Sequence, residues 1–177
     1  MTFDDFIDSL GLRFFAPDEF LVATDRELNT PPPIGLWQNI VMTALVLDTL
    51  RERIGHPVVI SSCYRAPAYN RSIGGVVRSQ HQAFVATDFV VSRVPAQEIA
   101  TELRSWRGDW IDVPFVPNRV RYTVPDVGLV PYCELEHRTL TMEGKADRLQ
   151  VKFHGGVGEY FTFTHLDTRG LSADWKG

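Results

Sequence analysis

The chain has 177 residues, of which 44% are hydrophobic, and this length suits one compact domain with a sizeable core. Its formal net charge of −4 argues against a nucleic-acid-binding protein, because such proteins neutralise phosphates with a basic patch. No apolar run approaches the roughly 18 residues that a membrane span needs. The first residues carry acids before any base and do not resemble a signal peptide. We therefore expect a single domain over residues 1–177, with no nucleic-acid partner, no membrane span and no visible export route.

Helical spacing of apolar side chains predicts three helices in the first two thirds of the chain. A short amphipathic helix is expected around residues 3–10. The longest helix is expected over residues 36–54, where Gly55 ends it. A third begins after Pro95, a residue that suits the first turn of a helix.

Short β-branched runs predict strands at residues 57–62 and 85–91, with a loop-and-turn region between them. Toward the C-terminus, residues 149–154 and 160–167 are predicted strands on either side of a glycine-rich turn at 155–158. Helices and strands do not alternate regularly. The pattern therefore favours an α+β fold with a mainly antiparallel sheet over a parallel doubly wound fold.

Residues 108–150 contain several prolines and glycines, with short β-like runs at 119–124 and 138–142. We interpret this region as inserted hairpins and loops within the same domain. A long insert beside an active site often forms a wall or a lid. Its aromatic side chains either line a groove for a glycan or peptide, or fill a small subsidiary core.

The two cysteines, Cys63 and Cys133, are too few for a disulfide framework and lack the close spacing of a thiolate zinc site. Two buried or half-buried thiols are expected, and nothing in the sequence supports a bridge between them. A cysteine hydrolase built on Cys63 is a distant alternative, since nothing adjacent marks an activated thiolate.

Asp88 is the most informative single residue, because it lies inside an otherwise apolar strand and a buried carboxylate is costly unless paired or bound to a metal. His81 lies in a polar loop seven residues before it. Far downstream, His165 and Asp167 project from the same face of a predicted strand. His81, Asp88 and His165 would form a zinc site with one position open for water. Structural histidines, and pairing of Asp88 with Arg65, remain alternatives on spacing alone.

Three separated blocks add a resemblance: residues 62–70 (SCYRAPAYN), residues 79–88 with S-Q-H and A-T-D, and residues 155–170 with G-G-V-G and H-L-D-T-R-G. Together they resemble the zinc D-alanyl-D-alanine carboxypeptidase family, an M15-like peptidase family that shares its fold with the vancomycin-resistance D,D-dipeptidase and the hedgehog signalling domain. Its pattern is S-x-H-x-x-G-x-A-x-D followed by a distant H, often H-x-D. The resemblance implies this fold, with helices packed on one side of the sheet.

The resemblance also implies roles for individual residues. His81, Asp88 and His165 would be the ligands of Zn²⁺. Arg65 would bind the substrate carbonyl and steady the oxyanion, as a fixed cation near developing charge does. Ser79 would hydrogen-bond the substrate backbone or order the loop that carries His81. The plainer alternatives are a surface salt bridge for Arg65 and a turn residue for Ser79.

Two positions depart from the family pattern. Phe84 replaces the usual glycine, so the loop between the ligands is expected to follow a different path or to present an apolar wall. Thr162 stands where relatives carry an acidic general base. Asp167 is the best catalytic substitute, although it could equally orient an imidazole, and Glu159 and His154 are weaker candidates.

The sequence therefore predicts a zinc metallopeptidase that hydrolyses D-amino-acid peptide bonds of a peptidoglycan stem peptide or cross-link, as a carboxypeptidase or an endopeptidase. Such an enzyme acts on the cell wall, in the periplasm or associated with a phage. The alternative is a zinc-containing cell-wall binding module that has lost turnover, which Thr162 favours.

Overall fold

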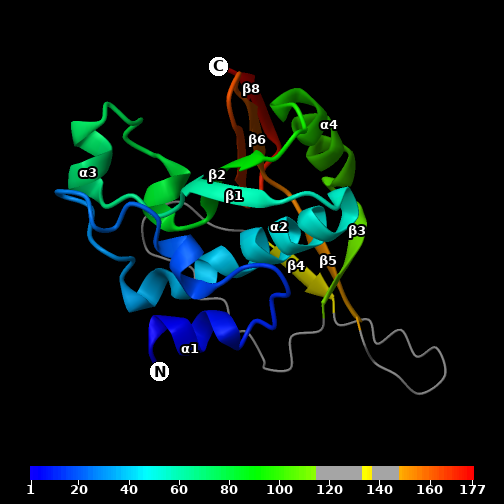
Figure 1. Cartoon of the computed structure of the whole chain (residues 1–177), viewed down its shortest axis with the longest axis horizontal. Helices are drawn as coiled ribbons and strands as arrows, with labels where there is room; N and C mark the ends of the chain where they lie inside the picture. Colours follow the sequence, from blue (N-terminus) through cyan, green and yellow to red (C-terminus); the bar gives the residue numbers. More distant parts are fainter. Residues whose placement is uncertain (115–132, 137–147) are drawn as a thin grey trace.

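The computed structural model describes residues 1–114, 133–136 and 148–177, and these form an α+β fold with two sheets (Figure 1). The predicted runs at 119–124 and 138–142 lie outside the described residues. The elements, with η marking a 3₁₀ helix, are α1 (Phe3–Asp8), η1 (Pro17–Leu21), η2 (Ile34–Ile40), α2 (Val41–Ile54), β1 (Val58–Ser62), α3 (Pro67–Ser72), η3 (Gln80–Ala83), β2 (Ala86–Val91), α4 (Ala96–Trp106), β3 (Trp110–Pro114), β4 (Cys133–Glu136), β5 (Arg148–Phe153), β6 (Gly156–Glu159), β7 (Thr164–Asp167) and β8 (Ala173–Lys176).

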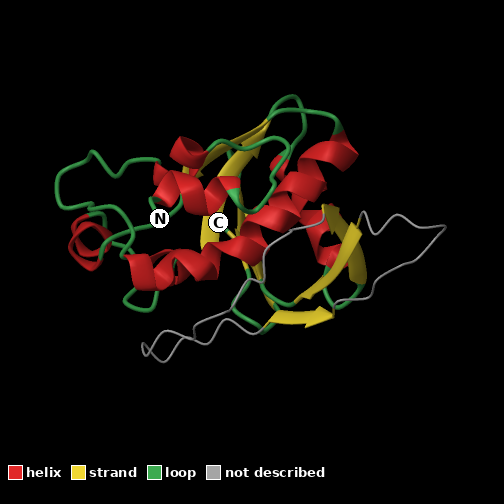
Figure 2. Ribbon diagram, turned by 90° about the horizontal axis from the view of Figure 1, so that it is seen from below, coloured by secondary structure: helices red, strands yellow, loops and turns green. Residues whose placement is uncertain are grey.

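The main sheet has five strands in the order β1-β2-β7-β6-β8. Neighbouring strands are antiparallel except β6 and β8, which run parallel. The predicted α+β class is confirmed, but this sheet is mixed, because β8 pairs with the outer side of β6 rather than returning beside β7. Strands β3, β5 and β4 form a separate antiparallel sheet that contacts α2 through β3 (Figure 2). Among the described residues, no helix has both the length and the apolar character needed to cross a bilayer.

The register of the main sheet separates a core face from a polar face. Asp88 pairs with His165 across β2 and β7, so the two side chains share one face. Their neighbours Phe89 and Leu166 project to the opposite face, where both are fully buried in a core that includes residues of α2 and α4. The long helices thus support the sheet from behind, and η3 brings His81 to the polar face.

Two regions differ in detail from the prediction. The helix expected over residues 36–54 is a 3₁₀ helix up to Ile40 and an α-helix only from Val41. The tighter winding accompanies two hydrogen bonds, from the Trp37 indole to the Pro32 carbonyl at 2.9 Å and from the Asn39 amide to the Ala83 carbonyl at 2.9 Å. The loop-and-turn region after β1 contains the short helix α3, which has a proline in its first turn.

The glycine-rich segment at 155–158 is not the predicted turn. Gly156 and Gly158 lie in strand β6, and the chain turns after it, between Tyr160 and Phe163. These glycines allow a close approach instead, because a Cβ on Gly158 would lie 2.6 Å from Nε1 of Trp175. The strand predicted over 160–167 is accordingly shorter and begins at Thr164.

We expect Gly158→Ala to destabilise the protein by about 1–3 kcal/mol, the usual cost of overpacking a filled site. The added methyl group would displace the Trp175 ring, which lies against β6. Thermal unfolding would measure the loss. Gly35→Ala is the matched control, since a Cβ there has no atom within 4 Å, and equal stability of both variants would contradict the close-approach explanation.

Candidate active site

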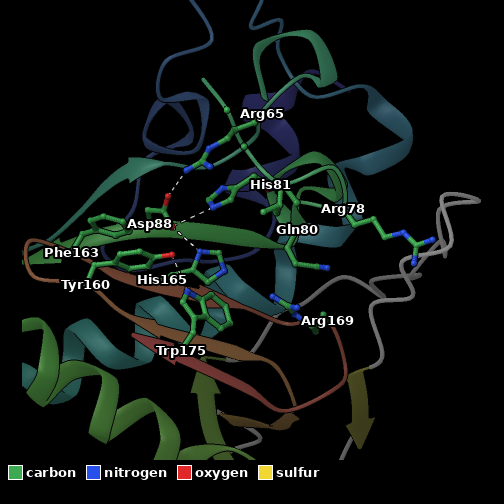
Figure 3. A pocket seen from close by; sticks show the side chains of 14 residues that line it. Arg65, Arg78, Gln80, His81, Asp88, Tyr160, Phe163, His165, Arg169 and Trp175 are labelled. Atoms are coloured by element: carbon green, nitrogen blue, oxygen red, sulfur yellow. Dashed lines mark hydrogen bonds and ion pairs between the residues drawn. The ribbon is translucent and has the colours of Figure 1, made fainter. Parts of the chain in front are cut away.

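His81, Asp88 and His165 come together on the polar face of the main sheet, although β7 lies far from η3 and β2 in sequence (Figure 3). One potential ligand atom from each residue lies within 4.8 Å of the others, and all three side chains are buried. Oδ1 of Asp88 lies 2.7 Å from Nδ1 of His165 and 3.2 Å from Nε2 of His81. The three potential metal-ligand atoms therefore lie close together around one point.

The outward nitrogen of each imidazole has a hydrogen-bond acceptor. Nδ1 of His81 lies 2.6 Å from the Cys63 carbonyl oxygen, and Nε2 of His165 lies 3.0 Å from Oδ2 of Asp167. A neutral imidazole that donates its single N–H outward keeps a lone pair on the inward nitrogen. Such outer partners commonly orient metal-binding histidines, and two imidazoles with one carboxylate are a donor set that suits catalytic zinc.

The ionisation of the three side chains is compatible with a metal ion. Burial lowers the pKa of His81 and favours its neutral form. Burial opposes charge on His165 and Asp88 as well. For His165, the hydrogen bonds to Asp167 and Asp88 outweigh burial and raise its pKa. For Asp88, the interactions with His165 and His81 outweigh burial and lower its pKa. A metal has to displace the proton of His165, so metal binding should weaken as the pH falls.

Arg65 pairs with Asp88, the arrangement that the sequence left open as an alternative to metal binding. Its Nη2 binds Oδ2 of Asp88, while Nε donates to the Ser62 hydroxyl at 2.9 Å. Because Oδ1 faces both histidines, the ion pair and the cluster coexist. Arg65 also lines the pocket above the cluster, as does the buried Ser79.

Asp167 lies behind His165. It is fully buried and accepts hydrogen bonds from the backbone of Gly156 and from the backbone and guanidinium of Arg169, in addition to His165. These bonds outweigh the cost of burial and lower its pKa. Asp167 does not line the pocket, so of its two expected roles the geometry favours orientation of the imidazole over proton transfer.

Asp167→Asn should therefore weaken zinc binding by roughly 10- to 100-fold, the usual cost of losing an outer partner of a metal ligand. An amide can present its NH₂ group to Nε2 of His165 and favour the wrong tautomer. Competition with a chromophoric chelator would measure the affinity. Unchanged zinc affinity together with lost turnover would instead return Asp167 to a role in proton transfer.

The cluster forms the floor of a pocket of about 520 Å³. One wall comes from the loop before η3, and the other carries Tyr160, Phe163, Arg169 and Trp175. Among the described lining residues, Asp88 is the only carboxylate. The position where relatives carry the general base is also outside the pocket, since Thr162 is solvent-exposed. The candidate Glu159 forms ion pairs with Arg104 and Lys176. His154 does not line the pocket either.

Sequence reasoning missed the aromatic wall. Tyr160 stacks on Phe163 with ring centroids 4.2 Å apart, and its hydroxyl oxygen accepts a 2.9 Å hydrogen bond from Nε1 of Trp175. Trp175 also lies beside His165, with centroids 5.0 Å apart. The spacing of two residues between Phe163 and His165 could have placed Phe163 on the same face. Nothing local indicated Trp175, which reaches the site through the β6–β8 pairing.

Phe84 keeps a left-handed backbone (φ 57°), the conformation that glycine adopts most easily. Its ring is fully buried, with its centroid 5.9 Å from that of Tyr64 and 6.2 Å from that of Phe3. The expected apolar wall is therefore not formed by Phe84. Cys63 is a free, fully buried thiol, and burial raises its pKa, so it is not an activated nucleophile.

A His–Asp–His cluster at the floor of an open pocket is typical of a metal-dependent hydrolase. Residues 15–116, more than half of the chain, match the family model described as Peptidase M15, and the chain belongs to this family of zinc-dependent metallopeptidases. The matched range includes His81 and Asp88, and the β2–β7 pairing adds His165 from outside it. No curated protein and no solved structure matched the chain.

Proposed function

We propose that this protein is a zinc-dependent peptidase that hydrolyses D-amino-acid peptide bonds in peptidoglycan stem peptides or cross-links. One observation carries the proposal: Nε2 of His81, Oδ1 of Asp88 and Nδ1 of His165 converge at the pocket floor. Both imidazoles have acceptors that direct their lone pairs inward. The resemblance of the three motif blocks to D-alanyl-D-alanine carboxypeptidases supports the choice of substrate.

The remaining roles follow from position in the pocket. Bound zinc would polarise the scissile carbonyl and lower the pKa of a bound water. Arg65 would hold Asp88 with Nη2 and offer its free Nη1 to the developing oxyanion. Ser79 would bind the substrate backbone. The Tyr160 hydroxyl oxygen accepts from Trp175, so its own proton is available as a second donor to the reacting group.

The second candidate is a zinc-containing cell-wall binding module without turnover. Asp88 is the only carboxylate among the described residues that line the pocket, and its two oxygens already contact His81, His165 and Arg65. Among the described residues, no free carboxylate is therefore placed to carry a proton. Within this part of the chain, a pocket residue such as Tyr160 would have to replace that acid.

The deciding experiment incubates zinc-loaded protein with purified muropeptides and with peptides ending in D-alanyl-D-alanine, and separates the products by liquid chromatography with mass spectrometry. We expect cleavage that a chelator abolishes and added zinc restores, with His165→Ala as the inactive control. Binding of zinc and muropeptide without any product would support the binding module. Chelator-resistant cleavage would contradict both candidates.

A further inference from the structure

We propose that Arg78, Gln80 and Arg169 form a carboxylate-binding end of the pocket, here called the cationic end, and that the substrate is a peptide with a free carboxylate close to the bond that is cut. This inference rests on the proposed peptidase function for the identity of the ligand. The residues themselves carry the case for a binding site of this chemistry.

Gln80 is the central observation. It is 7% exposed and lines the pocket, yet its side-chain amide makes no hydrogen bond with any residue in the described part of the chain. Figure 3 shows the Gln80 amide directed into the pocket, on the side that also holds Arg78 and Arg169. A ligand with polar groups would complete its hydrogen bonding.

The two arginines supply charge to the same end. Arg78 lines the pocket with an exposed guanidinium that has no ion pair within residues 1–114, 133–136 and 148–177. Arg169 uses Nε and Nη2 to bind Asp167 and lies over the Trp175 ring, 5.4 Å from its centroid. Its remaining Nη1 is therefore held in a fixed orientation beside the pocket. Guanidinium groups bind carboxylates through paired, charge-assisted hydrogen bonds.

The charge balance of the pocket also favours an anion. Three arginines line its described part, of which Arg65 is paired with Asp88 and Arg169 with Asp167. Among the described residues, Arg78 thus has no compensating charge, in a chain whose formal net charge is −4. A local excess of positive charge inside a concave site raises the local concentration of negatively charged ligands.

The opposite end of the pocket has a different character. The stacked rings of Tyr160 and Phe163 form an apolar wall there. A peptide that crosses the metal centre would place its carboxylate at the cationic end and its apolar part against these rings. The carboxylate can belong to the C-terminus or to a side chain next to the scissile bond.

Binding of acid and amide forms of one peptide tests this inference. The probes are an N-acetylated peptide ending in D-alanyl-D-alanine, its C-terminal amide, and a longer peptide with an acidic side chain, free or amidated. Calorimetry would measure each affinity on protein freed of zinc with a chelator, so that no probe is cleaved. We expect at least one free acid to bind about 10- to 100-fold more tightly than its amide, the range for hydrogen bonds to a charged group. The acid–amide pair whose affinities differ shows whether the cationic end binds the C-terminal or the side-chain carboxylate.

Two variants and a control assign the effect to residues. Arg78→Ala should remove most of the acid-over-amide preference, and Gln80→Ala should weaken acid and amide alike. Arg71→Ala is the matched control, because Arg71 is an exposed arginine on neighbouring α3 that does not line the pocket. Equal binding of acid and amide, or equal losses in Arg71→Ala and Arg78→Ala, would overturn the inference. If the protein binds the free acid more tightly than the amide but the parent protein cleaves no peptide, the cationic end is supported and the proposed peptidase function is contradicted.

Discussion

Replacing His81, Asp88 or His165 by alanine should remove most of the bound zinc, with a loss of affinity greater than about 10²-fold. The loss of an outer partner already costs 10- to 100-fold, and each of these residues would supply one of the three ligand atoms found among the described residues. Metal analysis after dialysis against a weak chelator would measure occupancy. The stabilisation that zinc gives to thermal unfolding should disappear with it, because a ligand stabilises only the state that binds it.

His56→Ala is the control for this prediction, since His56 is outside the cluster. Asp88→Asn should accompany Asp88→Ala, because complete removal of the carboxylate leaves the Arg65 guanidinium without its partner and destabilises the fold for a separate reason. Full zinc occupancy in a folded variant at any of the three positions would remove that residue from the ligand set.

Arg65→Lys should lower kcat/KM by roughly 10²- to 10³-fold while zinc content stays unchanged, the range for losing one oxyanion donor. A lysine ammonium can retain the ion pair with Asp88. It lacks the planar guanidinium that contacts Asp88 and the Ser62 hydroxyl at once and has a further nitrogen to offer to the reacting group. Steady-state kinetics on a muropeptide, combined with metal analysis of the same sample, would measure both quantities.

Tyr160→Phe provides an independent comparison, because it removes one hydroxyl and preserves the ring that stacks on Phe163. A similar fall in kcat with unchanged zinc would support Tyr160 as the second donor. If Arg65→Lys loses zinc or fails to fold, Arg65 serves mainly to hold Asp88. Full activity in both variants would mean that neither side chain contacts the reacting group.

Local patterns in the sequence were sufficient for most elements of the core. The strands at β1 and β2, the long helix and the helix after Pro95 appear close to their expected positions, because periodicity reports which side of an element is buried. The same logic identified Asp88, a carboxylate in an apolar strand. The match to the Peptidase M15 family confirms the broad class that the motif blocks predicted.

The environment of the site depended on strand pairing, which periodicity does not specify. Nothing local to Gly158 indicates that Trp175 lies over it, or that β8 runs parallel to β6. Both follow from contacts between segments separated in sequence, and they decided that the glycines form a strand rather than a turn. The orientation of Asp167 is similar: its alternation with His165 was readable, but its bonds to Gly156 and Arg169 required the fold. The sequence by itself thus indicated the three residues that the structure brings together as a possible metal site. The tertiary structure decided which groups orient them and line the pocket, because those contacts join strands that only folding brings together.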